Sequence, residues 1–221
     1  RDFNCLADMK KVPILTKREA RDNQDQLVNL RESSWSLEFK TSGSTGNPFK
    51  AIVSPFHWVI EQSCVWRHWS WAGYRFRDKV AIVRSHVPKN ETDLIKVDKI
   101  RNFYYFSPFH LTDEHIEFYL NKMIEFKVEF LRGYPSSILA IAVFVKNNPD
   151  VSIPKFKGIL TASERLGVNE KHIIESSLQS PVFNHYGLAE QVVMFGSCEK
   201  GTHMHNYEEY GGLELLETGD S

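Results

Sequence analysis

The feature that most constrains the fold is an alternation of short apolar runs with longer helical patterns along the second half of the chain. Strands are predicted by apolar runs at 79–83, 128–131, 158–160 and 182–186. Helices are predicted between them by apolar residues at helical spacing, at 112–124, 137–145 and 169–178. Because consecutive parallel strands are joined by right-handed helical crossovers, this order predicts an α/β fold with a mainly parallel sheet flanked by helices.

The first part of the chain has a different character. Residues 1–38 are polar and charged, and we expect a leading segment with a short helix there. A loop is expected at 39–48, before an aromatic-rich helix that begins at Ser54 and Pro55 and extends to Gly73. That helix is apolar nearly all round, which predicts that it is buried, with its tryptophans in the core. At the other end of the chain, we expect an antiparallel edge strand at 211–217.

Charge and cysteine content exclude several classes of partner. Lys and Arg total 27 against 28 Asp and Glu, so no global field attracts nucleic acid or an anionic membrane. No apolar run approaches the roughly 20 residues of a membrane span. Cys5, Cys64 and Cys198 are odd in number and widely spaced, which favours a reducing compartment, and we expect a cytoplasmic protein.

Residues 41–48, with the sequence TSGSTGNP, are rich in hydroxyls and glycine. Such a loop can surround an anion, because glycine exposes backbone N–H donors and serine and threonine add hydroxyl donors. An ordinary solvated turn is the alternative. The Walker loop is excluded, since it would need Gly-Lys-Ser/Thr where Pro48, Phe49 and Lys50 stand.

The order of residues in this loop resembles the phosphate-binding signature of the adenylate-forming (AMP-binding) superfamily, which includes the acyl-CoA synthetases. Two later segments resemble the same superfamily in the same order: 160–166 (LTASERL) is similar to its G-G-E-x-L segment, and 184–190 (NHYGLAE) to its Y-G-x-x-E segment. The phenylacetate-CoA ligase branch, with the coenzyme F390 synthetases and capsular polysaccharide biosynthesis proteins, is indicated by VPILTK at 12–17, RGYPSS at 132–137 and MHNYEEY at 204–210. Within that branch the capsular group fits best.

The resemblance implies ATP-dependent activation of a small carboxylic acid as an acyl-adenylate, followed by transfer to coenzyme A or another acceptor. The carboxylate attacks the α-phosphorus of ATP, so two anions must be brought together by magnesium, hydrogen-bond donors and a cation. Expected cofactors are therefore ATP and Mg, with coenzyme A as a possible third. Expected partners are the acid and the nucleotide, with no nucleic acid, and a homodimer stays open.

The same resemblance assigns site residues. The phosphates of ATP are assigned to Thr41, Ser42, Gly43, Ser44, Thr45 and Gly46, with Lys50 as a further candidate. Phe49 stands where many relatives carry the lysine, which weakens the assignment of Lys50. Adenine is assigned to Ala162, Ser163, Glu164, Tyr186 and Gly187. The acyl pocket is assigned to Tyr134, Pro135 and Ser136, catalysis to His110 and Glu190, and magnesium to Glu190 and Thr45.

Each assignment has a structural alternative. Tyr186 could be a core residue at a strand end. Glu164 could be a helix-start carboxylate, and His110 a hydrogen-bonded loop residue. The turn at 134–136 could serve packing alone. Zinc is not expected, although Cys198, His203 and His205 suggest it, because Gly196 stands where a C-x-C pair needs its first cysteine.

The T-G-D at 218–220 resembles a hairpin turn of this branch more than the ribose-binding aspartate of the superfamily. We therefore expect 1–221 to be part of an N-terminal nucleotide-binding domain, with a leading segment at 1–38 and an α/β core at 39–221. The C-terminal domain is then absent, and the isolated fragment is expected to be inactive. The alternative functions are adenylylation or acyl transfer serving polysaccharide synthesis, and a catalytically inactive nucleotide-binding or assembly module.

Overall fold

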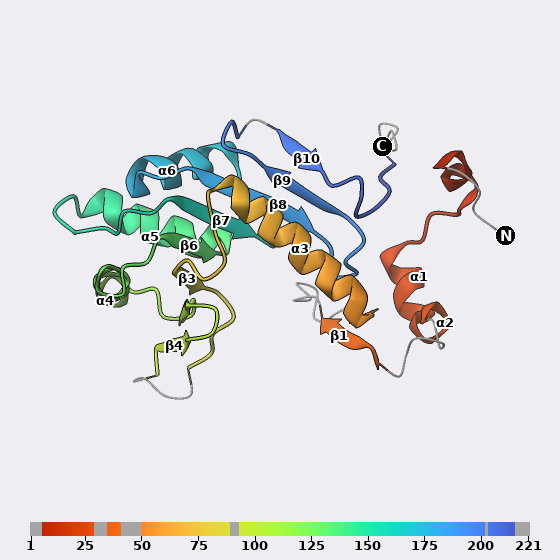
Figure 1. Cartoon of the computed structure of the whole chain (residues 1–221), viewed down its shortest axis with the longest axis horizontal. Coiled ribbons are helices and arrows are strands. Elements are labelled where there is room, and N and C mark those ends of the chain that lie inside the picture. The colour runs from red at the N-terminus through yellow and green to blue at the C-terminus, as the bar shows by residue number, and fades with distance from the viewer. Residues whose placement is uncertain (1–5, 29–34, 41–49, 89–92, 202, 215–221) are drawn as a thin grey trace. The chain divides into compact units, whose positions relative to one another are not determined.

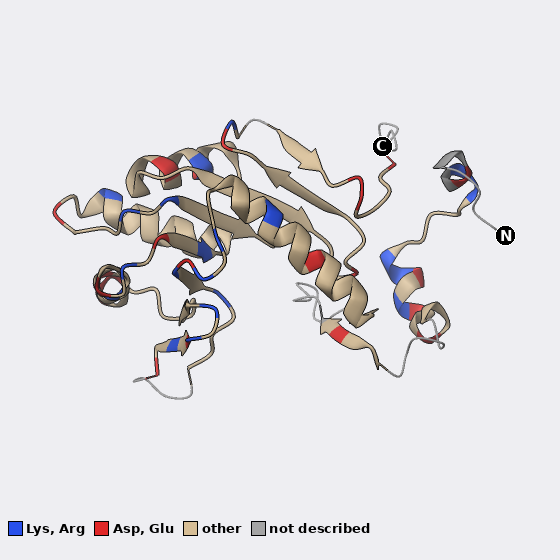
Figure 2. Cartoon of the chain, viewed as in Figure 1, with Lys and Arg blue, Asp and Glu red and all other residues tan. Residues whose placement is uncertain are grey.

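The computed structural model describes residues 6–28, 35–40, 50–88, 93–201 and 203–214 (Figure 1). The chain divides into two compact units. The first unit consists of Arg1–Cys64, Gly187–Met194 and Asn206–Ser221, and the second of Val65–Tyr186 and Phe195–His205. Basic and acidic residues are interspersed along the helices of both units (Figure 2), as the net charge of -1 leads one to expect.

The second unit is built on an eight-stranded sheet with the order β10-β9-β8-β7-β6-β3-β5-β4. The strands are β3 (Val80–Val83), β4 (Ile95–Asp98), β5 (Phe103–Phe106), β6 (Phe130–Gly133), β7 (Gly158–Ala162), β8 (Val182–Gly187), β9 (Met194–Ser197) and β10 (Met204–Asn206). The five strands β5, β3, β6, β7 and β8 run parallel, and β4 pairs antiparallel with β5. The predicted α/β fold with a mainly parallel sheet is confirmed.

Local sequence signals start the helices where they were expected. Thr112 caps α4 (Asp113–Glu125) by accepting a hydrogen bond from the backbone N–H of His115. Pro135 is the first residue of α5 (Pro135–Asn147), and α6 (Val168–Leu178) begins where Glu170 accepts from the backbone N–H of Gly167. The longest helix is α3 (Pro55–Trp71).

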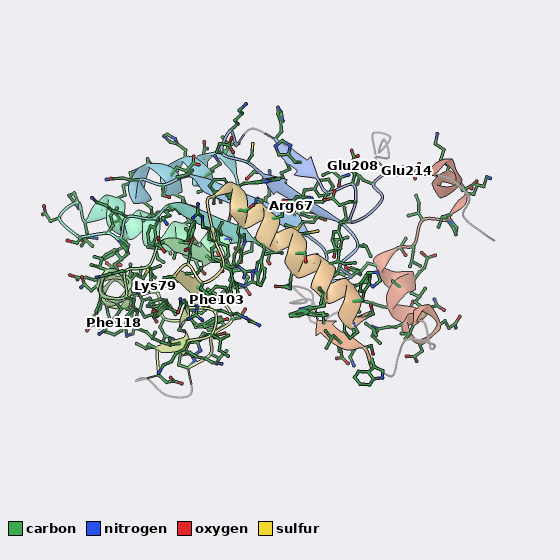
Figure 3. All side chains as sticks on the ribbon, in the orientation of Figure 1. Arg67, Lys79, Phe103, Phe118, Glu208 and Glu214 are labelled. Atoms are coloured by element: carbon green, nitrogen blue, oxygen red, sulfur yellow. The ribbon has the colours of Figure 1, made fainter. Side chains whose placement is uncertain are left out.

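Burial of apolar side chains holds these elements together. One core cluster joins the sheet to α4, α5 and α6 and includes Ala81, Leu131, Ile159, Leu120, Ile138, Ile141 and Ile174. Another group of aromatic rings surrounds Trp69, whose ring centroid lies 5.1 Å from that of Tyr74 and 6.1 Å from that of Phe103. Phe103 is labelled in Figure 3. A fully buried aromatic or aliphatic side chain contributes roughly 1.5–3 kcal/mol relative to an exposed one. The sheet is therefore buried by side chains on both faces.

The first unit contains the short elements η1 (Leu6–Lys11), α1 (Lys17–Asp22), α2 (Gln24–Leu27), β1 (Leu37–Lys40) and β2 (Lys50–Val53). The short helix expected in the leading segment is confirmed, and Thr16 and Glu19 form a capping box at the start of α1. Strands β1 and β2 pair antiparallel, with Leu37 opposite Val53.

Four details differ from the expectations. Helix α3 is not buried all round, because Phe56 is 71% and Trp66 41% exposed. Phe39 lies in β1 rather than in the loop. The strand expected at 128–131 lies at 130–133, and the backbone N–H of Val128 still bonds to the carbonyl of Met123 at the end of α4. Of the expected edge strand, residues 211–214 form no strand, and the remaining positions lie outside the described residues.

Among the described residues, no helix combines the length and apolar character needed to cross a membrane.

Candidate functional site

The carboxyl ends of the parallel strands lie at one edge of the sheet, and three segments singled out in the sequence follow these ends. In the register, Val83 lies opposite both Phe106 and Gly133, and Ala162 lies opposite His185. The loops that leave this edge lead to His110 after β5, to Tyr134 after β6 and to Ser163 after β7. Open α/β sheets bind their ligands at this edge.

The turn at the start of α5 is joined to the loop after β7. Tyr134 is the N-cap of α5, and its side chain satisfies none of the free N–H groups of the first turn. Instead, Oε2 of Glu164 accepts a hydrogen bond of 3.0 Å from the backbone N–H of Ser136. Glu164 is thus a helix-start carboxylate, though for α5 rather than for the helix that follows it in the sequence. The structure brings together one residue assigned to the acyl pocket and one assigned to adenine.

Ser163 adopts a backbone conformation that serine rarely takes. Its φ is +73°, in the left-handed region, whereas its neighbour Ala162 is buried in regular strand geometry. Left-handed geometry costs a non-glycine residue roughly 1–2 kcal/mol. The side chains of Ser163 and Glu164 remain exposed at the edge of the sheet.

Tyr186, next to last in β8, is not a core residue. It is 51% exposed, and its ring centroid lies 5.9 Å from that of Phe195. The structural alternative of a buried strand-end tyrosine is therefore excluded, and one flat face remains accessible. Gly187 follows, and a Cβ added there would meet ordinary contacts at 3.7 and 3.8 Å, so this glycine is not required sterically.

His110 lies in the loop between β5 and α4. Its Nδ1 is 2.9 Å from Oγ of Ser107, and its ring lies 6.0 Å from that of His115. No interaction with the turn at 134–136 or with Glu164 is recorded for it among the described residues. The histidine is thus a hydrogen-bonded loop residue, and its catalytic assignment stays a prediction.

The residues assigned to phosphate and magnesium belong to the first unit. Thr41, Ser42, Gly43, Ser44, Thr45 and Gly46 lie outside the described residues. Lys50 begins β2, with its Nζ 3.6 Å from Oε1 of Glu38. Glu190 is exposed, and its carboxylate has no recorded partner in the described part of the chain.

Two arginines at the carboxyl edge were not identified as site residues from the sequence. Arg84 follows the last residue of β3, and Arg132 lies within β6. The Arg84 guanidinium lies 5.0 Å from the centroid of the Tyr134 ring, and that of Arg132 lies 4.7 Å from the Trp69 ring. The signal that could have revealed them is a cation in or directly after an otherwise apolar strand.

Two buried histidines lie in the same unit. His68 is fully buried, and its Nε2 lies 3.0 Å from the carbonyl oxygen of Ser197, to which Nε2–H donates. Burial lowers the pKa of His68 to about 4, against which the Ser197 hydrogen bond acts. Burial also lowers the pKa of His185 well below its usual value, as do electrostatic interactions with Arg132, His68 and Arg84. Both imidazoles are neutral at pH 7.

Cys198 and His205 lie close together. The pKa of the half-buried Cys198 thiol is lowered, chiefly by a hydrogen bond with His205. Across the described segments, no group of three or more His, Cys, Asp or Glu side chains is arranged to hold a metal ion. The expected absence of zinc stays an expectation.

The first unit also contains an open pocket of about 600 Å³, which has a predominantly apolar lining. It is lined by His57, Leu188, Gln191, Val192, Val193, Tyr210, Gly211, Gly212, Leu213 and Glu214. None of these residues was singled out from the sequence as a site residue. Gly211 is sterically required there, because a Cβ would lie 1.7 Å from the carbonyl oxygen of Val192.

No protein-family model matches the chain. The protein CapK of Staphylococcus aureus is 24% identical over 198 residues, which cover 84% of this chain and 42% of CapK. The chain therefore spans less than half the length of this curated relative. The match agrees with the capsular branch of the resemblance.

Solved structures of acyl-CoA ligases are similar to the chain. A 2-hydroxyisobutyryl-CoA ligase in an open conformation, in complex with 2-HIB-AMP and CoA, matches with a TM-score of 0.64 at 15% identity, over 91% of this chain and 46% of that one. A malonyl-CoA ligase with methylmalonyl-CoA and AMP bound matches with a TM-score of 0.51 at 18% identity, over 75% of this chain and 35% of that one. The chain therefore has the fold of the acyl-CoA ligases, over less than half of their length.

Proposed function

We propose that the protein containing this chain uses ATP to activate a carboxylic acid as an acyl-adenylate and then transfers the acyl group to coenzyme A or another acceptor. The observation that carries the proposal is the hydrogen bond between the Ser136 amide and Glu164 at the carboxyl edge of the parallel sheet. It links the turn assigned to the acyl group with the segment assigned to adenine. Similarity of fold to ligases crystallised with an acyl-AMP supports the same reaction class.

The residues of the chain suit the binding steps of this reaction. The accessible face of Tyr186 offers a surface on which an adenine ring can stack. The glycines and hydroxyls of 41–46 supply donors for phosphate oxygens. Lys50 is the weaker phosphate candidate, because its ammonium group is already close to Glu38.

Magnesium fits the donor set at Glu190. Mg²⁺ prefers oxygen ligands and is usually held by one or two carboxylates together with the phosphates of the substrate. The Glu190 carboxylate is exposed and has no partner among the described residues, so its oxygens are available for such a role. Bound magnesium would neutralise negative charge on the phosphates.

A role in capsular polysaccharide biosynthesis is the narrower form of the proposal. It is supported by the similarity to CapK and by the sequence segments that resemble the capsular group. The acid would then be activated for attachment to, or modification of, a polysaccharide precursor.

The test is an acid-dependent exchange of labelled pyrophosphate into ATP, measured with the complete protein across a panel of carboxylic acids. Adenylation is reversible, so at least one acid is expected to give exchange that requires both the acid and Mg²⁺. Omission of the acid is the matched control. Tight ATP binding without exchange for any acid would overturn the proposal in favour of a nucleotide-binding module.

A further inference from the structure

Arg84 and Arg132 lie near one another at the carboxyl edge of the sheet. Strands β3 and β6 are parallel neighbours, and Val83 of β3 lies opposite Gly133 of β6. Arg84 directly follows Val83, and Arg132 directly precedes Gly133. Each guanidinium has an aromatic ring as its neighbour, as described above. Within the part of the chain that the structure describes, neither guanidinium forms an ion pair with a carboxylate.

The positive charges of Arg84 and Arg132 are not balanced by a carboxylate in the described part of the chain. Burial, together with the positive charge of Arg84, lowers the pKa of Arg132 to about 9. Tyr105 and Tyr134 act on the pKa of Arg132 in the opposite direction, and the nearby His68 and His185 are neutral bases that supply no negative charge. Each cation–π contact stabilises its guanidinium but supplies no full negative charge to balance it. The pair is therefore poised to receive an anion.

The surroundings of the pair include further donors. The hydroxyls of Ser85 and Tyr134 lie 3.3 Å apart, beside the Arg84 guanidinium. Ser85 is held in the left-handed region with a φ of +57°. Both arginines are only partly buried, so a small molecule can approach them. A guanidinium fork with hydroxyls beside it matches the geometry of a carboxylate or a phosphate.

We propose that Arg84 and Arg132 form an oxyanion-binding subsite, with the hydroxyls of Ser85 and Tyr134 at its rim. The oxyanion is the carboxylate of the acyl substrate or a phosphate of the nucleotide. This identification of the two sources rests on the proposed function, whereas anion binding itself does not. Arg84 and Arg132 would place the anion beside the turn at 134–136.

The test is protection of arginines from phenylglyoxal in the complete protein, with each site read by mass spectrometry of the digest. This reagent modifies accessible guanidine groups, so an anion bound between Arg84 and Arg132 is expected to slow the modification of both. The probes are sodium acetate, inorganic phosphate and AMP, against sodium chloride at equal ionic strength. Arg77 and Arg101, which are exposed, are internal controls in the same digest.

Saturable protection of Arg84 and Arg132, with no protection of Arg77 and Arg101, is the expected result. Protection by acetate alone assigns the subsite to the acyl carboxylate, and protection by phosphate and AMP alone assigns it to the nucleotide; either supports the subsite. Because no turnover is measured, a protein without pyrophosphate exchange can still show protection.

Variants sharpen the test. Arg132→Met should weaken protection of Arg84 by roughly tenfold to a hundredfold, the loss expected for one charge-assisted contact, and Arg84→Met should do the same to Arg132. If Arg132→Met does not fold, Arg132→Lys takes its place in the test, because lysine keeps a positive charge at this position. Equal modification of all four arginines with and without each probe in the wild-type protein would overturn the proposal.

Discussion

Glu164 caps the N-terminus of α5 by accepting a 3.0 Å hydrogen bond from the backbone N–H of Ser136, which lies 28 residues earlier in the chain. The negative charge lies at the positive end of the α5 dipole, where carboxylates are favoured. Because the two residues follow neighbouring parallel strands, the same bond also fixes the two loops relative to each other. Local capping and the geometry of the candidate site are therefore coupled.

Glu164→Ala is expected to lower the free energy of unfolding by about 1 kcal/mol, the usual loss for a helix N-cap. Glu164→Gln should cost less, because the amide oxygen can still accept the bond. Urea unfolding followed by circular dichroism measures both variants. Glu117→Ala, at an exposed position on α4, is the control. An equal effect of the Glu117 and Glu164 substitutions would remove the capping role.

At position 163 we expect glycine not to lower the stability of the protein, in contrast to its usual effect. Since its φ is +73°, Ser163→Gly should leave stability unchanged or raise it by up to about 1 kcal/mol, whereas Ser163→Val should lower it by about 1–2 kcal/mol. The control is Ser176→Gly in α6, where glycine should cost about 0.5 kcal/mol. Thermal unfolding of the three variants decides the sign. A loss at Ser163→Gly as large as that at Ser176→Gly would contradict the strain.

The sequence predicted strands and helices well where one local pattern, such as an apolar run or a capping residue, was strong. The continuous apolar run in β3 reflects burial on both faces, and Thr112 marked the start of α4 through its capping chemistry. The strands β4, β5, β9 and β10 of this sheet were missed. In β4 only intermediate and exposed residues occur, so no apolar pattern distinguishes it from a loop.

The candidate site was predicted only in part, because the deciding features are relations between distant residues. Tyr186 was named from its neighbours, yet its exposure depends on how the strands around it end. Predicting that Arg84 and Arg132 lie close together requires the register of β3 against β6, and this register is known only once the two strands are paired. The cap from Glu164 to Ser136 likewise depends on β6 and β7 being adjacent.

Glu190→Gln tests the magnesium assignment. Replacing a carboxylate by an amide removes the charge that a hard cation prefers while keeping the shape of the side chain. The apparent affinity for Mg²⁺ in pyrophosphate exchange is expected to fall by roughly tenfold to a hundredfold. Glu199→Gln, at another exposed glutamate, should leave it unchanged. Wild-type magnesium dependence in Glu190→Gln, with the fold intact by circular dichroism, would remove Glu190 from the mechanism.

His68 predicts how stability depends on pH. Its pKa is about 4 in the folded protein and near 6.5 when unfolded, so between these values the unfolded chain binds more protons. Stability is therefore complete above pH 6.5 and falls as the pH drops toward 4, by up to about 1.4 kcal/mol per pH unit from this residue. His185, whose pKa is also lowered, acts in the same direction.

The measurement is urea unfolding of the wild-type protein and of His68→Gln at pH 7 and pH 5. The amide of glutamine can still donate to the Ser197 carbonyl but cannot titrate, so the variant should lose less stability on acidification than the wild type. Part of the loss should remain, because His185 still titrates. His172→Gln, at an exposed position on α6, should follow the wild-type curve. If His68→Gln and the wild type lose the same stability on acidification, protonation of His68 does not oppose folding. The interpretation of His68 as a buried, neutral side chain is then wrong.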